Sequence, residues 1–326
     1  MPDFVSLLLF LVALFACATA YMLYKKRQTR LNHLLGQLHS LEITGGLKKL
    51  LTQIQQHRGM ASAYLNGDFS FKYKIAALQS DIDRQFDQLS GQFKHSPESL
   101  QSCADIRDAW KQLHPCVLHL SKEDSFERHC LLIGAVLNLI RDTAEHSQLH
   151  RESICPYSFI EILWHLLPDT AEAIGQARAI GTGVAAAGHC RITDRIKLGF
   201  LITRIRQAVE RVEAGMGNAK IAMVADNSFQ LASAAVHVHI AHLISHIEQK
   251  LLTADKPAID PAAFFETATG TLNSVFTLYD QGEVITNHTL QNQLISARRN
   301  SKQSFAMVLA SLVFLAASLV LKHGVS

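Results

Sequence analysis

Two short segments, one in each half of the chain, combine residue types that can bind an anion. Each reads Gln-x-Arg, then small, apolar, small and hydroxyl residues, at 56–63 and at 176–183. In a helix the arginine and the hydroxyl four residues later share a face, which pairs Arg58 with Ser62 and Arg178 with Thr182. The Gly and Ala residues around them let helices approach closely, so we expect both arginines between packed helices, where each needs a negative partner.

That partner is either an internal carboxylate or a small anion from outside. A guanidinium presents a planar fork of N–H donors that fits two coplanar oxygens of an oxyanion. Internal ion pairs are much more common, so residue types alone favour them. The internal candidates are Asp81 or Asp83 for Arg58, and Glu172 or Glu210 for Arg178.

Uncharged apolar runs lie near both ends of the chain, at residues 4–24 and 305–321. The first is long enough to cross a hydrocarbon core of about 30 Å as a helix, and the second is at the short end of that range. A cleaved signal peptide is the competing interpretation of the first run. Because no cations precede that run, we interpret both runs as retained transmembrane helices.

Seven cations lie on the inner sides of these runs: Lys25, Lys26, Arg27 and Arg30 follow the first, and Arg298, Arg299 and Lys302 precede the second, whereas Lys322 is the one Lys or Arg in the sequence on an outer side. By the positive-inside rule, the middle region faces the cytoplasm of a bacterial inner membrane. Six scattered cysteines without metal-site spacing indicate reduced thiols, which agrees with a cytoplasmic location.

The region between the apolar runs has helical periodicity and no strand pattern. Turn signals divide it into eight helical segments, four on each side of Pro156. We therefore predict an all-α fold with two four-helix bundles, at residues 25–155 and 156–303, between the two transmembrane helices. Gly45, Gly46 and Gly282 are expected to loosen the long first and last helices.

Other function classes find little support. Charge is nearly balanced, with 31 Lys and Arg against 28 Asp and Glu, so no basic field predicts nucleic-acid binding. No catalytic motif is present, and we expect neither enzymatic activity nor a cofactor. His239, His242 and His246 share a helical face that could bind a metal or haem, but a solvated face is the simpler interpretation, and no metal site is predicted.

Three segments in order resemble the nitrate- and nitrite-sensing (NIT) domain family of bacterial chemoreceptors and sensor kinases. They read QQHRGMASAYLNGD at 55–68, LP at 167–168 followed by IGQARAIGTGVAAAG at 174–188, and FFETAT at 264–269. The resemblance covers roughly residues 30 to 300. It implies an all-helical sensor that binds nitrate or nitrite through arginines, with Arg58 and Arg178 as ligand-binding residues and Ser62 and Thr182 as hydroxyl donors.

This chain departs from the family pattern in two ways. Ala179 stands in the second segment where the first has Gly59, and no output module follows the second apolar run. The resemblance therefore predicts a membrane sensor that signals to a separate, unknown protein, and it leaves a homodimer open. The alternatives are a membrane adaptor whose arginines form internal ion pairs only, or, with less support, a metal- or haem-binding protein.

Overall fold

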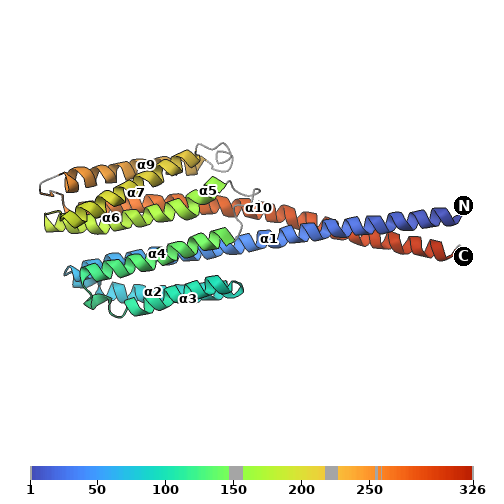
Figure 1. The fold of residues 1–326 in the computed structure, drawn as a ribbon, viewed down its shortest axis with the longest axis horizontal. Coiled ribbons are helices and arrows are strands. Elements are labelled where there is room, and N and C mark those ends of the chain that lie inside the picture. Colours follow the sequence, from blue (N-terminus) through green and yellow to red (C-terminus); the bar gives the residue numbers. More distant parts are fainter. Residues whose placement is uncertain (1, 147–156, 217–226, 254–255, 258, 325–326) are drawn as a thin grey trace. The chain divides into compact units, whose positions relative to one another are not determined.

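The computed structural model describes the whole chain except residues 1, 147–156, 217–226, 254–255, 258 and 325–326 (Figure 1). The described residues are almost entirely helical and contain no strand, which confirms the predicted all-α class. They form two compact units, Ser40–Thr286 and a pair made by Met1–His39 with Asn287–Ser326.

The first helices of the larger unit have apolar faces at helical spacing. Leu47, Leu50 and Ile54 in the first helix are fully buried. Phe86 and Trp110, in the two helices that follow it, are also fully buried in this core. The elements are α1 (Pro2–Leu65), η1 (Phe69–Phe71), α2 (Lys72–Gln92), η2 (Phe93–His95), α3 (Pro97–Leu113), η3 (Val117–His119) and α4 (Lys122–His146).

The later helices begin and end at residues that suit helix termini. The backbone N–H of Ala263 donates to the Asp260 carboxylate (2.9 Å), so Asp260 caps the last helix, with Pro261 at its first position. Gly188 ends another helix in the left-handed region, at φ +64°. The elements are α5 (Tyr157–Glu161), η4 (Ile162–Leu166), α6 (Leu167–Ala187), α7 (Ile192–Met216), α9 (Asn227–His246), η5 (Ile247–Leu252) and α10 (Pro261–Gly324).

The prediction that three glycines loosen the long helices is wrong, because α1 and α10 continue through them without a break. These glycines allow close packing instead. A methyl group on Gly46 would lie 3.0 Å from the Leu89 side chain, and one on Gly282 would lie 2.8 Å from Leu163. The predicted boundary at Pro156 lies outside the described residues. The division into two bundles stays a prediction, because all these helices share one compact unit.

The smaller unit is a pair of helices formed by the ends of α1 and α10, with both chain termini at the same end (Figure 1). The Tyr24 and Phe305 rings lie 5.8 Å apart, and the Ser301 hydroxyl donates to Gln28 at 3.1 Å. Buried small residues lie at spacings of seven or fourteen residues along each helix, as in closely packed membrane helices. They include Ala13 and Ala20 on α1 and Ser304 and Ser318 on α10.

The outer surface of this helix pair is apolar. Phe15 is 73% exposed and Val313 is 71% exposed, and many neighbouring leucines are similarly uncovered. By length and composition, α1 and α10 could each cross a membrane.

Candidate functional site

The two Gln-x-Arg segments meet where α1 and α6 come together in the larger unit. A methyl group built on Gly175 of α6 would lie 2.8 Å from Arg58 Nη2, and one on Gly59 of α1 would lie 3.9 Å from Arg178 Nη2. Each arginine thus reaches a glycine on the opposite helix. The small residues permit this close approach, as the sequence predicts.

Arg58 is held by a carboxylate from α6. Its Nη1 donates to Glu172 Oε1 at 2.6 Å, and its Nη2 donates to Oε2 at 3.1 Å. The Gln55 and Gln176 amides also donate to this carboxylate, at 2.9 and 2.8 Å. Arg58 and Glu172 are 2% and 4% exposed, so this is a buried, bidentate ion pair with four hydrogen bonds to the acid.

Arg178 lies close to this pair in a different environment. Its Nη1 donates to the Thr269 hydroxyl at 3.0 Å, and its guanidinium carbon lies 4.8 Å from the centre of the Phe265 ring. Within the part of the chain that the structure describes, no carboxylate forms an ion pair with Arg178. Burial, with a further contribution from the positive charge of Arg58, lowers the Arg178 pKa from its usual value to about 10.

The two predicted hydroxyl donors differ in their surroundings. Thr182, one helical turn beyond Arg178, has a buried side-chain oxygen that makes no hydrogen bond to any described residue. Such a group is costly to bury without a partner. Ser62 is half-buried one turn beyond Arg58.

The expected internal partners are only partly right. Asp81 pairs with Arg84, and Asp83 accepts a hydrogen bond from the Trp110 indole at 2.9 Å, so neither binds Arg58. Glu172 does form an ion pair, with Arg58 rather than with Arg178. We call Arg58, Glu172 and Arg178 the arginine cluster.

Two buried histidines lie near the arginine cluster: His57 precedes Arg58 in the chain, and His129 precedes Cys130, which Arg58 contacts. The Ser125 carbonyl can only accept, so His129 Nδ1 donates to it (2.6 Å), which leaves Nε2 to accept from His57 Nδ1 at 2.8 Å. Gln79 donates to His57 Nε2 at 3.1 Å. Burial is the main reason why the pKa of His57 is lowered to about 3 and the pKa of His129 to about 4. Both imidazoles are therefore neutral at pH 7.

The histidine stripe on α9 is only partly a solvated face, because His246 is half-buried. His239 and His242 are exposed, whereas Ile240 and Leu243 on the opposite side are buried. Among the residues with described positions, no three His, Cys, Asp or Glu side chains come together as a metal site would require.

Several residues of the site escaped the sequence-based prediction. The motif at 264–269 includes Phe265 and Thr269 but predicts no contact with Arg178, whereas the structure shows both residues in contact with it. Phe126 lies under the Arg58 guanidinium at 5.5 Å, and Cys130 Sγ accepts from Arg58 Nη1 at 3.2 Å. The Phe265 and Thr269 contacts could have been found from the four-residue spacing, which places both on one face of α10.

Comparison with known proteins agrees with this geometry. The family model described as nitrate and nitrite sensing matches residues 49–281, which include the whole arginine cluster. The fold is similar to that in a structure titled "Structure of the NasR transcription antiterminator", with a TM-score of 0.62 and 17% identity over 94% of this chain and 82% of that one. No curated protein matches this sequence.

Proposed function

Because the chain belongs to the nitrate- and nitrite-sensing family, we propose that it is a membrane-anchored sensor that binds nitrate or nitrite at the arginine cluster. The main support for the proposal is that the positive and negative charges of this buried cluster do not balance. It holds two guanidinium groups and one carboxylate, a net charge of +1, and the neighbouring His57 and His129 are neutral. A buried uncompensated cation is costly, so one monovalent anion would stabilise the site.

The anion would bind mainly to Arg178. Arg58 already has a bidentate partner, whereas the described bonds of Arg178 are one hydrogen bond to Thr269 and a ring contact. Nitrate is planar, so two of its oxygens match the guanidinium fork. The unpartnered Thr182 hydroxyl lies one turn away on the same helix and could donate to the ligand.

Occupancy would change how three helices hold together. Arg58 comes from α1, Arg178 from α6, and Thr269 with Phe265 from α10. An anion shared by these helices would favour the packing in which they are closest, and a ligand that prefers one packing shifts the population toward it. We propose that a separate signalling protein responds to this shift and that the chain has no catalytic activity of its own.

Nitrate should raise the melting temperature of the full-length protein in detergent, and Arg178→Gln should abolish the increase. Ligand at one hundred times its dissociation constant stabilises a protein by about 2.7 kcal/mol. Chloride at the same ionic strength is the reference anion, because it lacks the paired oxygens of nitrate. Melting curves at increasing nitrate and nitrite concentrations measure the effect.

Arg206→Gln is the matched control, because it removes an arginine of the same unit that forms an exposed pair with Glu248. This variant should keep the full nitrate response. An unchanged melting temperature of the wild-type protein in nitrate would contradict the sensor proposal. It would favour the adaptor alternative, in which the arginines form internal ion pairs only. The Arg58–Glu172 pair supports that alternative, because Arg58 already has an internal partner.

The proposed orientation places the larger unit in the cytoplasm, because seven cations flank the inner sides of the apolar runs. A reporter enzyme that is active only outside the cytoplasm should be inactive when inserted at the exposed turn near Gly67. The same reporter fused after Ser326 should be active, since both tails are proposed to face outward. Activity at Gly67 would contradict this topology.

A further inference from the structure

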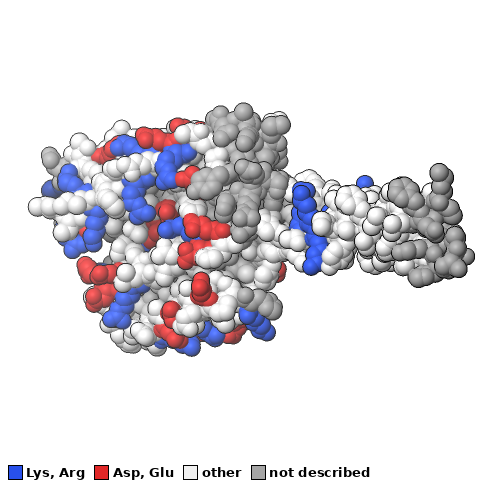
Figure 2. Space-filling model, turned by 45° about the vertical axis from the view of Figure 1, so that its right-hand side comes forward, with Lys and Arg blue, Asp and Glu red and all other residues white. Residues whose placement is uncertain are grey.

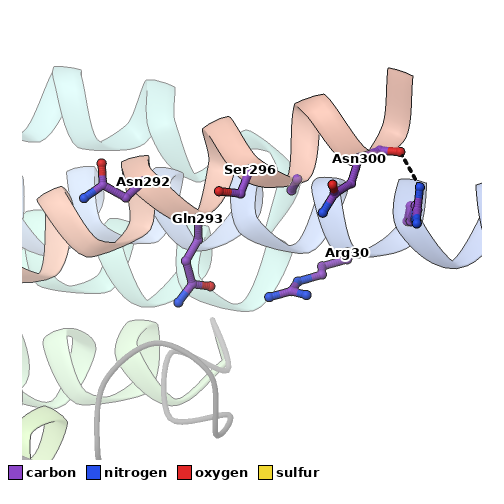
Figure 3. Close-up of a pocket in the computed structure, with 7 residues that line it drawn as sticks. Arg30, Asn292, Gln293, Ser296 and Asn300 are labelled. Atoms are coloured by element: carbon purple, nitrogen blue, oxygen red, sulfur yellow. Dashed lines mark hydrogen bonds between the residues drawn. The ribbon is translucent and has the colours of Figure 1, made fainter. Parts of the chain in front are cut away.

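A groove between α1 and α10 in the smaller unit is lined by cations and amides. It has a volume of ≈ 450 Å³, within the usual range of small-molecule sites. Figure 3 shows Arg30 extending along this groove toward Gln293, with Asn300 and Ser296 on the facing helix. Arg27 also lines the groove and donates to the Asn300 carbonyl at 2.8 Å, which joins the two helices at its end.

The groove lies in a part of the chain with uncompensated positive charge. Seven Lys and Arg residues lie on the inner sides of the apolar runs, and the only acidic residue in the sequence of this unit, Asp3, lies at the opposite end of the first run. Figure 2 shows the basic side chains as a band across the helix pair, beside the uncharged surface of the runs. Arg30 is exposed, and no carboxylate of the described residues pairs with it.

The position of the groove matches the depth of lipid headgroups. Arg27 and Arg30 follow Tyr24 by three and six residues, which corresponds to about 5 and 9 Å along a helix. The headgroup layer extends roughly 5 to 8 Å beyond the hydrocarbon core, and long arginine side chains can reach back toward it. Basic pockets beside membrane helices attract anionic lipids by about 1 kcal/mol per cation.

We propose that this groove binds the headgroup of an anionic phospholipid, with the phosphate at Arg30. The amides of Asn292 and Asn300 and the hydroxyl of Ser296 suit a headgroup that carries hydroxyl groups, such as glycerol. This inference rests on the membrane anchoring proposed above. It is independent of nitrate binding, because none of the groove residues belongs to the arginine cluster.

The test counts lipids that stay bound to the full-length protein. Protein extracted from membranes is equilibrated with phosphatidylglycerol and phosphatidylcholine of identical acyl chains and examined by native mass spectrometry. Wild-type protein should retain phosphatidylglycerol preferentially, and Arg30→Gln should reduce this retention by about tenfold, as expected for one charge-assisted hydrogen bond to phosphate. The control is Arg299→Gln, which removes an equally exposed cation outside the groove and should change retention little.

Three results would overturn the inference. Equal retention of the two lipids would remove the preference for anionic headgroups, and equal loss in both variants would show diffuse charge attraction without a site. Displacement of the bound lipid by millimolar inorganic phosphate would assign the groove to free phosphate. Absence of the protein from the membrane fraction would instead refute the anchoring itself, so the two failures are distinguishable.

Discussion

Replacing Glu172 with alanine is expected to lower the free energy of unfolding by about 3–5 kcal/mol, the usual cost of breaking a buried ion pair. The Arg58 guanidinium is 2% exposed and would keep its charge without a partner. The Gln55 and Gln176 amides would lose their acceptor at the same time. Thermal or urea unfolding of the full-length protein in detergent measures the loss.

Two further variants separate a buried charge from general damage. Glu248→Ala breaks the exposed pair with Arg206 and should cost less than about 1 kcal/mol. In the double variant Arg58→Met with Glu172→Leu, no charge is left unpaired, so the loss should be much smaller than for Glu172→Ala alone. Nitrate should also stabilise Glu172→Ala more than the wild type, because the cluster would then carry two uncompensated charges. Equal losses in Glu172→Ala and Glu248→Ala would contradict this account.

Acidification from pH 7 to pH 4 should destabilise the protein through His57 and His129. Their pKa values are lowered to about 3 and about 4, mainly by burial, with smaller effects of His129 and His114 on His57 and of Arg58 on His129. In the unfolded chain both would titrate near 6.5, so the unfolded state binds more protons below that pH. This contribution is complete above pH 6.5 and is lost as the pH falls toward 4, by up to about 3 kcal/mol per histidine.

The measurement is unfolding free energy against pH for the wild type and for the double variant His57→Asn with His129→Asn. Asparagine keeps a donor close to the Nδ1 position and does not titrate. Other groups also contribute to acid denaturation, so the informative quantity is the difference in slope between pH 6.5 and 4. His189→Asn removes an exposed histidine and should leave the slope unchanged. Identical slopes for wild type and double variant would disprove the role of the pair.

The helices and the burial of Arg58 and Arg178 between packed helices could be anticipated from local periodicity and small residues. The partner of each arginine could not. Glu172 was a candidate for Arg178, but six residues along a helix turn the side chain by about 600°, so the two point in directions about 120° apart. Glu172 therefore faces α1 and binds Arg58. Sequence spacing shows which residues share a helical face and leaves open which helix packs against that face.

The histidines illustrate the same limit. The α9 stripe stands out in the sequence because its members are close together, but they lie on a largely exposed face. His57 and His129, in contrast, are 72 residues apart and form a buried hydrogen bond. Glycines in long helices were similarly ambiguous: Gly46 and Gly282 could mark a break or a close contact, and only the neighbouring helix determines which.

The contacts of the two glycines at the α1–α6 crossing are unequal, and this asymmetry limits how the sequence can diverge. A methyl group at position 59 would lie at ordinary van der Waals distance from Arg178, whereas one at position 175 would intrude on Arg58. Alanine should therefore be tolerated at position 59 without a second substitution. The corresponding position of the second Gln-x-Arg segment, 179, is alanine in this sequence. A larger residue at 175 requires a shorter one at 58, so these two positions should covary across related sequences.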